Sequence, residues 1–309
     1  KLGHVALDGT KIKANASKHK AMSYERMKKR EVELAAEVDR WLKAAEAADA
    51  EEDKLYGSRR GDEMPDWVAD KQKRLAKIRA AKAELEAEAK AAAAEEMRRR
   101  AAAEERRIAE GRKKNGKTPA PPKQEPDGKA QRNFTDPESR ILKTKDGYIQ
   151  GYNAQAAVDA EAQIIVAHGL TPSMSDQDQF VPLLDTTEDN LDRKPREASA
   201  DAGYCSEANL AALAARDIRG YIATGRAKHP SDVKRKITGP LTKAMRDKLK
   251  RAGWRSRYRL RKQVVEPVFG QIKQARGFRQ FLLRGIEKVT AEWALICTAH
   301  NLTKLATAV

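Results

Sequence analysis

The sequence contains only two cysteines, and this scarcity excludes two kinds of site. Cys205 and Cys297 lie far apart in the chain and lack the spacing of a metal site. A disulfide framework requires several paired cysteines and an oxidising compartment. The two thiols therefore indicate a protein of a reducing cytoplasm, without structural disulfides and without a zinc site.

Long apolar runs are also missing. No stretch approaches the ~20 apolar residues that cross a membrane, and no secretory signal is recognisable. The histidines are few and scattered over different predicted elements, which argues against a histidine-based metal site or nucleophile; they are His4, His19, His168, His229 and His300. These absences predict a soluble intracellular protein with no membrane partner.

Positive charge, in contrast, is abundant. The 309 residues include 62 Lys and Arg against 45 Asp and Glu, which gives a formal net charge of +17. Phosphate contacts by Lys and Arg supply most non-specific affinity for nucleic acid, so nucleic acid is the leading predicted partner. A highly charged protein without a polyanionic partner stays open as an alternative on charge alone.

Residues 20–113 differ in composition from the rest of the chain. They are rich in Ala, Glu, Lys and Arg, which favours helices over a compact core. We predict a helix over residues 21–55, a turn at residues 57–61, and a second helix opened by Pro65 and Asp66. The second helix repeats apolar residues in a coiled-coil rhythm, at Leu75, Ile78, Leu85 and Ala92. An antiparallel helical hairpin is the simplest arrangement.

Beyond Ala92 the helical pattern fades, and we expect the chain to fray there. Residues 114–132 are rich in Pro, Gly and Lys and are predicted to form a flexible linker. Order is expected again over residues 133–309. Together with residues 1–19, which begin as a strand, these residues are predicted to form one core that the hairpin interrupts.

The pattern of this core predicts a mixed α/β fold. Two strand-like stretches, residues 147–159 and 163–170, are separated by a turn and suit a β-hairpin. Helices and short strands then alternate: a helix over 176–191, a strand over 197–201, a helix over 206–216, a strand over 220–224, and closing helices over 262–276 and 286–306. The first residue, Lys1, is not Met and the first strand begins in mid-pattern, which predicts that the chain is a piece of a longer protein.

Three acids that are far apart in the sequence are the candidate site. Asp8 and Asp201 each follow a short apolar run, so we expect both at strand ends, where α/β sheets bind ligands. Glu266 lies in a basic segment that is otherwise helical. Three carboxylates with open positions suit one or two Mg²⁺ ions, which can stabilise both the attacking and the leaving oxygen of a phosphoryl transfer.

Each acid also has a structural explanation when it is considered alone. Asp8 and Gly9 form a common turn dipeptide, and Asp201 with Gly203 suits a helix cap. Glu266 among Lys and Arg is usually a solvated ion pair. The joint occurrence of the three acids in a strongly basic chain favours the metal site.

The residues around these acids resemble DDE transposases of bacterial insertion sequences. The motifs that carry the resemblance are Leu7-Asp8-Gly9-Thr10-Lys11, Ala200-Asp201-Ala202-Gly203-Tyr204 and Glu266-Pro267-Val268-Phe269-Gly270-Gln271-Ile272-Lys273, with further similarity over residues 277–285 and 301–305. The resemblance implies an α/β, ribonuclease H-like mixed sheet flanked by helices, with the helical hairpin inserted after the first strand. It also implies that Asp8, Asp201 and Glu266 bind two Mg²⁺ ions, with Mn²⁺ as an alternative, to cut and rejoin transposon ends.

The same family often carries a Tyr, Arg, Glu, Lys signature around its glutamate. Lys273 has the expected spacing of seven residues after Glu266, whereas Tyr258 and Arg261 lie one residue too far upstream and Lys262 takes the expected arginine position. The resemblance assigns these four side chains to contacts with DNA ends. It further implies double-stranded DNA as partner, a homodimer on DNA, and a location at the nucleoid of the bacterial cytoplasm.

Three further residues are candidates for DNA contacts. Lys11 and Lys13 could touch the DNA backbone, with a plain solvated segment as the equal alternative. Trp254, among arginines, could stack on an unpaired base, and a Trp packed on the surface is its alternative. For the whole chain, two other functions stay open: an inactive or domesticated DNA-binding relative, and a ribonuclease H-like nuclease without strand transfer.

Overall fold

The computed structural model describes residues 2–56, 66–113, 116, 118–225 and 239–307. The chain divides into two compact units. One unit combines Lys1–Lys18 with Glu138–Val309, and we call it the core unit. The other, His19–Pro137, is the helical unit. The predicted turn at residues 57–61 and Pro65 lie outside the described residues.

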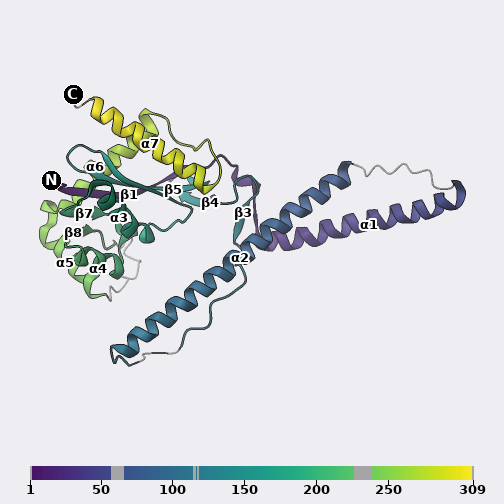
Figure 1. The fold of residues 1–309 in the computed structure, drawn as a ribbon, viewed down its shortest axis with the longest axis horizontal. Coiled ribbons are helices and arrows are strands. Elements are labelled where there is room, and N and C mark those ends of the chain that lie inside the picture. The colour runs from purple at the N-terminus through teal and green to yellow at the C-terminus, as the bar shows by residue number, and fades with distance from the viewer. Residues whose placement is uncertain (1, 57–65, 114–115, 117, 226–238, 308–309) are drawn as a thin grey trace. The chain divides into compact units, whose positions relative to one another are not determined.

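The core unit contains a six-stranded mixed sheet (Figure 1). Its strands are β1 (His4–Lys13), β4 (Arg140–Thr144), β5 (Gly147–Asp159), β6 (Ile165–Thr171), β7 (Glu197–Ala200) and β8 (Arg219–Ile222). The order is β4-β5-β1-β7-β8, and β6 also pairs with β5. β5 is antiparallel to β1, β4 and β6, whereas β7 is parallel to β1 and to β8. This mixed sheet confirms the predicted ribonuclease H-like α/β class.

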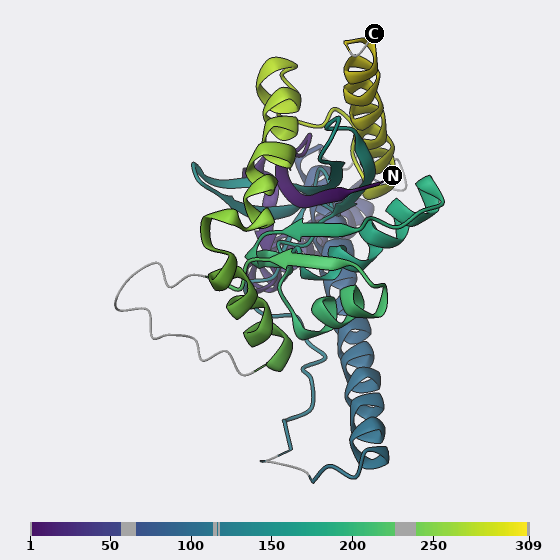
Figure 2. The same cartoon turned by 90° about the vertical axis from the view of Figure 1, so that its left-hand side faces the viewer.

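Helices cover both faces of the sheet (Figure 2). α6 (Leu260–Gly270) and α7 (Ile286–Ala306) pack on one face, and α3 (Phe180–Leu191) and α4 (Glu207–Ala215) pack on the other. Side chains of β1 alternate between these layers: Ala6 and Ile12 contact the α6–α7 layer, whereas Val5 and Leu7 contact the α3–α4 layer. Asp8 is two residues after Ala6 in the strand, so its side chain is on the same face of the sheet, which α6 covers.

The helical unit is built on an antiparallel helix pair, as the sequence predicts. α1 (Tyr24–Tyr56) packs against the first half of α2 (Asp66–Ala109), with Met27 and Leu34 of α1 against Leu75, Ile78 and Leu85 of α2. Lys82, which interrupts the apolar repeat, donates to Glu31 of the facing helix at 2.6 Å. At the base of the unit, β2 (Ala21–Ser23) pairs with β3 (Gln131–Asn133). The two ends of the inserted segment are therefore side by side.

The structure differs from the prediction after Ala92. α2 continues as a helix to Ala109, although its second half extends beyond the N-terminal end of α1. Chain from the predicted linker packs back along α2: Ala130 joins the apolar cluster of the helix pair, and Ala120 accepts a hydrogen bond from Arg100 at 2.8 Å. Alanine-rich sequence with neighbouring acids and arginines is sufficient for a helix, so the loss of apolar periodicity did not mark its end.

The expected end of the first strand is also wrong. β1 does not stop at Asp8 but continues to Lys13, and Asp8 pairs with Ala156 of β5. The Asp-Gly pair forms no turn here because β5 supplies nine consecutive partners from Val5 to Lys13. Across the described residues, no helix is both long and apolar enough to cross a membrane.

Candidate active site

The register between β1 and β7 brings two of the predicted acids together. Leu7 is the last residue of β1 that pairs with β7, and its partner is Ala200. Asp8 and Asp201 follow these two residues directly, so both acids come off the same end of the parallel ladder. Asp201 also serves as a cap, because its Oδ1 accepts a hydrogen bond from Gly203 N at 2.8 Å. The structural and the functional interpretation of Asp201 are therefore compatible.

Arg261 connects the third acid to this pair. Its Nη1 donates to Asp8 Oδ2 at 2.5 Å, and its Nη2 donates to Glu266 Oε1 at 3.1 Å. The Asp8 and Arg261 side chains are only 14% and 12% exposed, whereas Glu266 is 47% exposed. One guanidinium thus lies between the buried and the exposed carboxylate. Arg261, not Lys262, reaches the acids, although Lys262 has the expected spacing.

The ionisation of Asp8 is unfavourable in this environment. The pKa of Asp8 is raised to about 7, chiefly by burial and to a smaller extent by the charges of Asp201 and Asp176, whereas Arg261 opposes the shift. A carboxylate removed from water is destabilised unless a cation or hydrogen-bond donors replace the solvent. Asp8 therefore has a strong electrostatic preference for an additional positive charge beside it.

Asp176 is a fourth acid at the site, and the sequence did not single it out. Its Oδ1 accepts hydrogen bonds from Asn153 Nδ2 at 2.7 Å and from Gln155 Nε2 at 2.8 Å. A side chain at Gly9 or Gly203 would collide with this group: a Cβ at Gly9 would be 2.7 Å from Asp176 Oδ1, and one at Gly203 would be 3.0 Å from both Asp176 Oδ2 and Asp201 Oδ1. Asp176 and Asp201 therefore both approach the same point beside Gly203.

A buried hydrogen-bond network fixes Asp176 and its partners. Gln155 is fully buried in β5, and its Oε1 accepts from the hydroxyl of Tyr204, while its backbone carbonyl accepts from Trp293 Nε1 at 3.0 Å. Burial raises the pKa of Tyr204 well above its usual value, with the neighbouring acids contributing. The available signal was the pair of polar residues, Asn153 and Gln155, inside an otherwise apolar strand. Sequence alone could not show that Asp176 faces them.

Lys273 lies on the same side of the core unit as the acids. Its Nζ donates to the backbone carbonyl of Lys11 at 2.7 Å, and burial lowers its pKa. Lys11 itself donates to the carbonyl of Lys143 at 2.8 Å, and Lys13 is exposed next to it on β1. Lysines at residues 11, 13 and 273 therefore lie along the part of β1 that follows Asp8.

Tyr258 and Lys262 face a different space. They line a cavity of about 880 Å³, next to three further cationic side chains, Arg246, Lys250 and Arg259. The described residues that line this cavity include no acid. The residues predicted around the glutamate are thus divided: Glu266 and Lys273 lie towards β1, whereas Tyr258 and Lys262 line a basic cavity. The side chain of Trp254 lies outside the described residues.

The helix that carries Glu266 continues through Pro267. A proline leaves the carbonyl four residues earlier without its helical donor. Here that carbonyl, of Gln263, accepts from Gln163 Nε2 at 2.9 Å instead. After Gly270 the chain continues as a π-helix, Gln271–Ala275, which contains Lys273. A donor from outside the helix therefore compensates for the proline and allows Glu266 to sit in regular helix.

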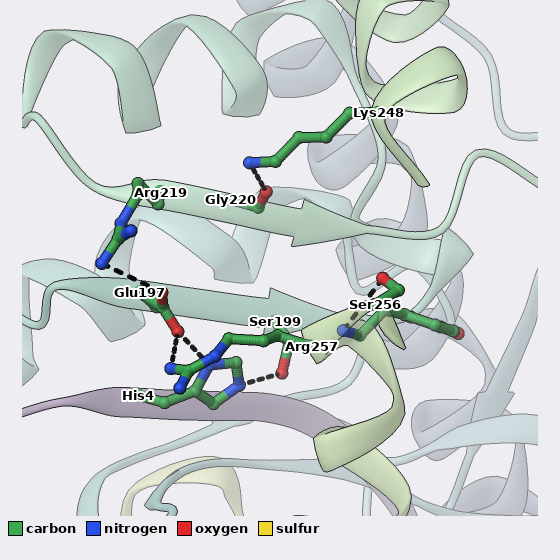
Figure 3. Close-up of polar contacts among 9 residues, drawn as sticks. His4, Glu197, Ser199, Arg219, Gly220, Lys248, Ser256 and Arg257 are labelled. Atoms are coloured by element: carbon green, nitrogen blue, oxygen red, sulfur yellow. Dashed lines mark hydrogen bonds and ion pairs between the residues drawn. The ribbon is translucent and has the colours of Figure 1, made fainter. Parts of the chain in front are cut away.

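A second polar cluster, at the opposite end of β7, anchors the approach to α6 (Figure 3). Glu197 is 2% exposed and accepts from Arg257 Nη1 at 2.5 Å, from Arg219 Nη2 at 3.1 Å and from His4 Nδ1 at 3.2 Å. Burial raises the pKa of Glu197, but its bonds to Arg257 and His4 bring it below the usual value. Arg257 directly precedes Tyr258, so Glu197 fixes the start of the segment that carries Tyr258, Arg261 and Glu266.

The donors at the site fit a hard divalent cation, although the acids are not arranged around one position. Asp8, Asp201 and Glu266 supply only oxygen, which Mg²⁺ prefers, and the burial of Asp8 favours either its protonation or a further cation beside it. Among the described residues, no three His, Cys, Asp or Glu side chains are grouped closely enough to hold an ion together. Arg261 separates Glu266 from Asp8, and its movement would be required before these two acids share a metal.

Comparison with known proteins gives one match. The family model described as Transposase DDE domain matches residues 127–302, which include Asp201, Glu266 and Lys273. Asp8 lies outside the matched range. No curated protein and no solved structure is significantly similar to the chain.

Proposed function

Since the chain belongs to the transposase DDE domain family, we propose that it cuts the ends of a DNA element and joins them to target DNA, with Asp8, Asp201 and Glu266 as ligands of Mg²⁺. The transposase class follows from the family. The observation that supports the site is the pairing of Leu7 with Ala200, because it delivers Asp8 and Asp201 side by side beneath the helix that carries Glu266. Nearby Asp176 keeps the local charge strongly negative.

Divalent ions at such a site activate a water or a 3′ hydroxyl and stabilise the leaving oxygen of the phosphodiester. The chain's own residues supply the remaining functions in this proposal. Asp8 and Asp201 are held by the sheet, so they provide fixed oxygens. Arg261 pairs with Asp8 and Glu266 in the free protein, and it would be available for a phosphate if these acids held a metal instead. Lys273, already beside β1, neutralises a second phosphate.

The basic cavity next to α6 supports the proposal of DNA as substrate. Its four cationic side chains, Arg246, Lys250, Arg259 and Lys262, suit a phosphate backbone, and Tyr258 connects the cavity to the segment that leads to Arg261. We assign double-stranded transposon ends and target DNA as ligands, with two copies of the chain acting together so that both ends are joined. The location of the protein at the bacterial nucleoid stays a prediction.

The proposal is tested with a labelled element end, target DNA and Mg²⁺ or Mn²⁺. We expect cleaved ends and strand-transfer products from the unaltered chain, and at least a hundredfold loss of both with Asp201→Asn. Asparagine is chosen because its side-chain oxygen can still cap Gly203 N, so that only the negative charge is lost. The matched control is Asp178→Asn, which removes an exposed acid two residues from Asp176.

The other outcomes identify the alternatives. Cleavage without joined products would indicate a nuclease of the same fold. Binding to DNA that does not change with Mg²⁺, with no cleavage by the unaltered chain, would indicate an inactive relative. Equal activity of Asp201→Asn and the unaltered chain would contradict the proposed site.

A further inference from the structure

After the exposed Glu287 and Lys288 of its first turn, α7 has no charged residue among its fully exposed side chains, in a chain that is otherwise rich in charge. Leu295, Leu302 and Leu305 are 70%, 61% and 57% exposed. From Ala291 to Ala306 the exposed residues are all Ala, Leu or Thr: Ala291, Leu295, Thr298, Ala299, Leu302, Thr303, Leu305 and Ala306. We call this surface the α7 face. Exposed leucines in such number on one helix indicate a contact surface, whereas single exposed leucines do not.

The threonines do not make this face polar. The hydroxyl of Thr298 donates to the carbonyl of Ala294 at 2.9 Å, and that of Thr303 donates to the carbonyl of Ala299 at 2.9 Å. Each hydroxyl is thus bonded within the helix. A partner can cover the α7 face without leaving either hydroxyl donor unpaired.

The helix itself is held firmly by its opposite side. Val289, Trp293, Ile296 and Cys297 are buried in the apolar cluster against the sheet. Near the C-terminal end, Asn301 bonds both the N–H and the carbonyl of Ile165 in β6, each at 2.8 Å. The α7 face is therefore a rigid surface, and a partner that binds it need not order a flexible segment.

The spacing along the face indicates a helix as its occupant. Ala291, Leu295, Thr298, Leu302 and Leu305 are separated alternately by four and three residues, which is the repeat of a coiled-coil seam. The seam is about 21 Å long at 1.5 Å per residue. DNA does not suit this surface, because a phosphate backbone requires cations or hydrogen-bond donors.

We propose that the α7 face binds the α7 face of a second copy of this chain. Two copies with a formal charge of +17 each repel one another, so close contact is least costly where neither copy places a charge. Because both copies carry the same spacing of apolar residues, the two faces can also pack against each other across a two-fold axis. Two further exposed leucines, Leu282 and Leu283 at 74% and 45%, are near α7, because their backbone N–H groups donate to Glu292.

The size of the seam sets the strength of the contact. A seam of about two heptads with three leucines per copy is short for a specific interface, which typically buries ~1,200–2,000 Å². The dimer is therefore expected to depend on concentration when DNA is absent. This contact involves none of the proposed catalytic residues, so it is tested independently of the chemistry.

The first test is sedimentation of the full chain without DNA, from about 1 to 200 µM. We expect reversible dimers, and we expect Leu302→Glu to raise the dissociation constant by roughly tenfold or more, because it places a charge within the seam. Val32→Glu is the matched control: Val32 is 70% exposed on α1 and is expected to leave association unchanged. Thermal melts of both variants verify that an exposed substitution leaves the fold intact.

The second test places a cysteine at the centre of the seam. In a Cys205→Ser background, Thr298→Cys is expected to form an oxidised dimer, whereas Val32→Cys is not, since a disulfide requires Cα atoms within about 7 Å. Monomers at every concentration would overturn the proposal. So would a dimer that Leu302→Glu leaves unchanged, or one that Thr298→Cys does not cross-link, because the copies would then meet through another surface. If Asp201→Asn loses strand transfer but forms the same dimer, the result supports the proposed catalytic site and does not bear on the α7 contact.

Discussion

Asp8 lies in a buried part of β1, where its charge is destabilising unless a cation faces it. The folded protein raises its pKa from 3.8 to about 7. Since the folded state holds the proton more tightly than the unfolded chain, this carboxyl contributes its full stability below about pH 4 and loses it as the pH rises through 7. A change of this size corresponds to about 4 kcal/mol.

Asp8→Asn should therefore stabilise the protein increasingly as the pH rises. The free energy of unfolding is measured in urea with a chelator present. At pH 4 we expect the ionisation of Asp8 to make little difference between the variant and the unaltered chain. By pH 7.5 we expect the variant to be more stable by up to about 4 kcal/mol. Added Mg²⁺ should reduce the gain, because it stabilises only the chain that retains the carboxylate. A gain that stays constant with pH would show that burial does not control the ionisation of Asp8. Asp178→Asn serves as the exposed control.

Glu197, in contrast to Asp8, is a buried acid whose negative charge is matched by several neighbouring donors. We expect Glu197→Gln to cost about 2 kcal/mol, because it removes the charged acceptor that the buried His4 and the partly exposed Arg257 share. Asp185→Asn breaks a half-exposed pair with Arg216 and should cost less than about 1 kcal/mol. Chemical denaturation of the two variants makes the comparison. Equal costs would mean that the Glu197 cluster does not hold the segment before α6.

At the residue scale the sequence predicted the acids but not how they are connected. Asp8, Asp201 and Glu266 were identifiable because each stands out against apolar or basic neighbours. Arg261 was predicted only to contact DNA ends, because its bond to Asp8 joins residues more than 250 positions apart. Asp176 was not distinguishable from other surface charges, since its significance depends on Asn153 and Gln155 of β5. The roles of all these residues in catalysis stay predictions.

Among the elements, the strand pair β1–β5 does most to position the site. Gly151 of β5 faces Lys13, and a Cβ added there would lie 2.3 Å from the carbonyl oxygen of Ile12. We expect Gly151→Ala to separate the two strands locally and to destabilise the core unit by about 2 kcal/mol or more. Gly270→Ala is the control, because its Cβ meets nothing within 4 Å at the end of α6 and should stabilise by about 0.5–1 kcal/mol. Thermal unfolding that ranks the two variants the other way would contradict the close approach of β1 and β5.

The elements themselves were predictable where their patterns are strong. The hairpin of β5 and β6, the helices α3 and α7, and the short buried strand β7 lie within a few residues of their expected positions. The strands β2, β3 and β4 were missed because they are short and polar, so that only their pairing partners define them. α5 (Pro240–Ala252) was missed although Leu241, Met245 and Leu249 recur at helical spacing; none of its residues is fully buried, and Met245 packs against the α3–α4 side of the core.

On the scale of the whole molecule, the helical unit behaves as a separable insertion. Its helices form their own apolar cluster, and its two ends pair with one another as Ala21 with Asn133 and Ser23 with Gln131. Because entry and exit are adjacent, the core unit does not need the insertion to bring residues 18 and 138 into reach of a short connection.

Replacing residues 21–133 with a linker of about six Gly and Ser residues should therefore leave a folded core unit. We expect a cooperative thermal transition and, with Trp254 also replaced by Phe so that one tryptophan remains, Trp293 fluorescence typical of a buried indole, because the cluster around Trp293 lies in the core unit. A matched chain that carries the same deletion and Gly151→Ala should melt at a lower temperature, which shows that the transition reports on the β1–β5 pairing. If the deleted chain instead unfolds without cooperativity, the core unit requires the helical unit to fold, and the two units are not independent.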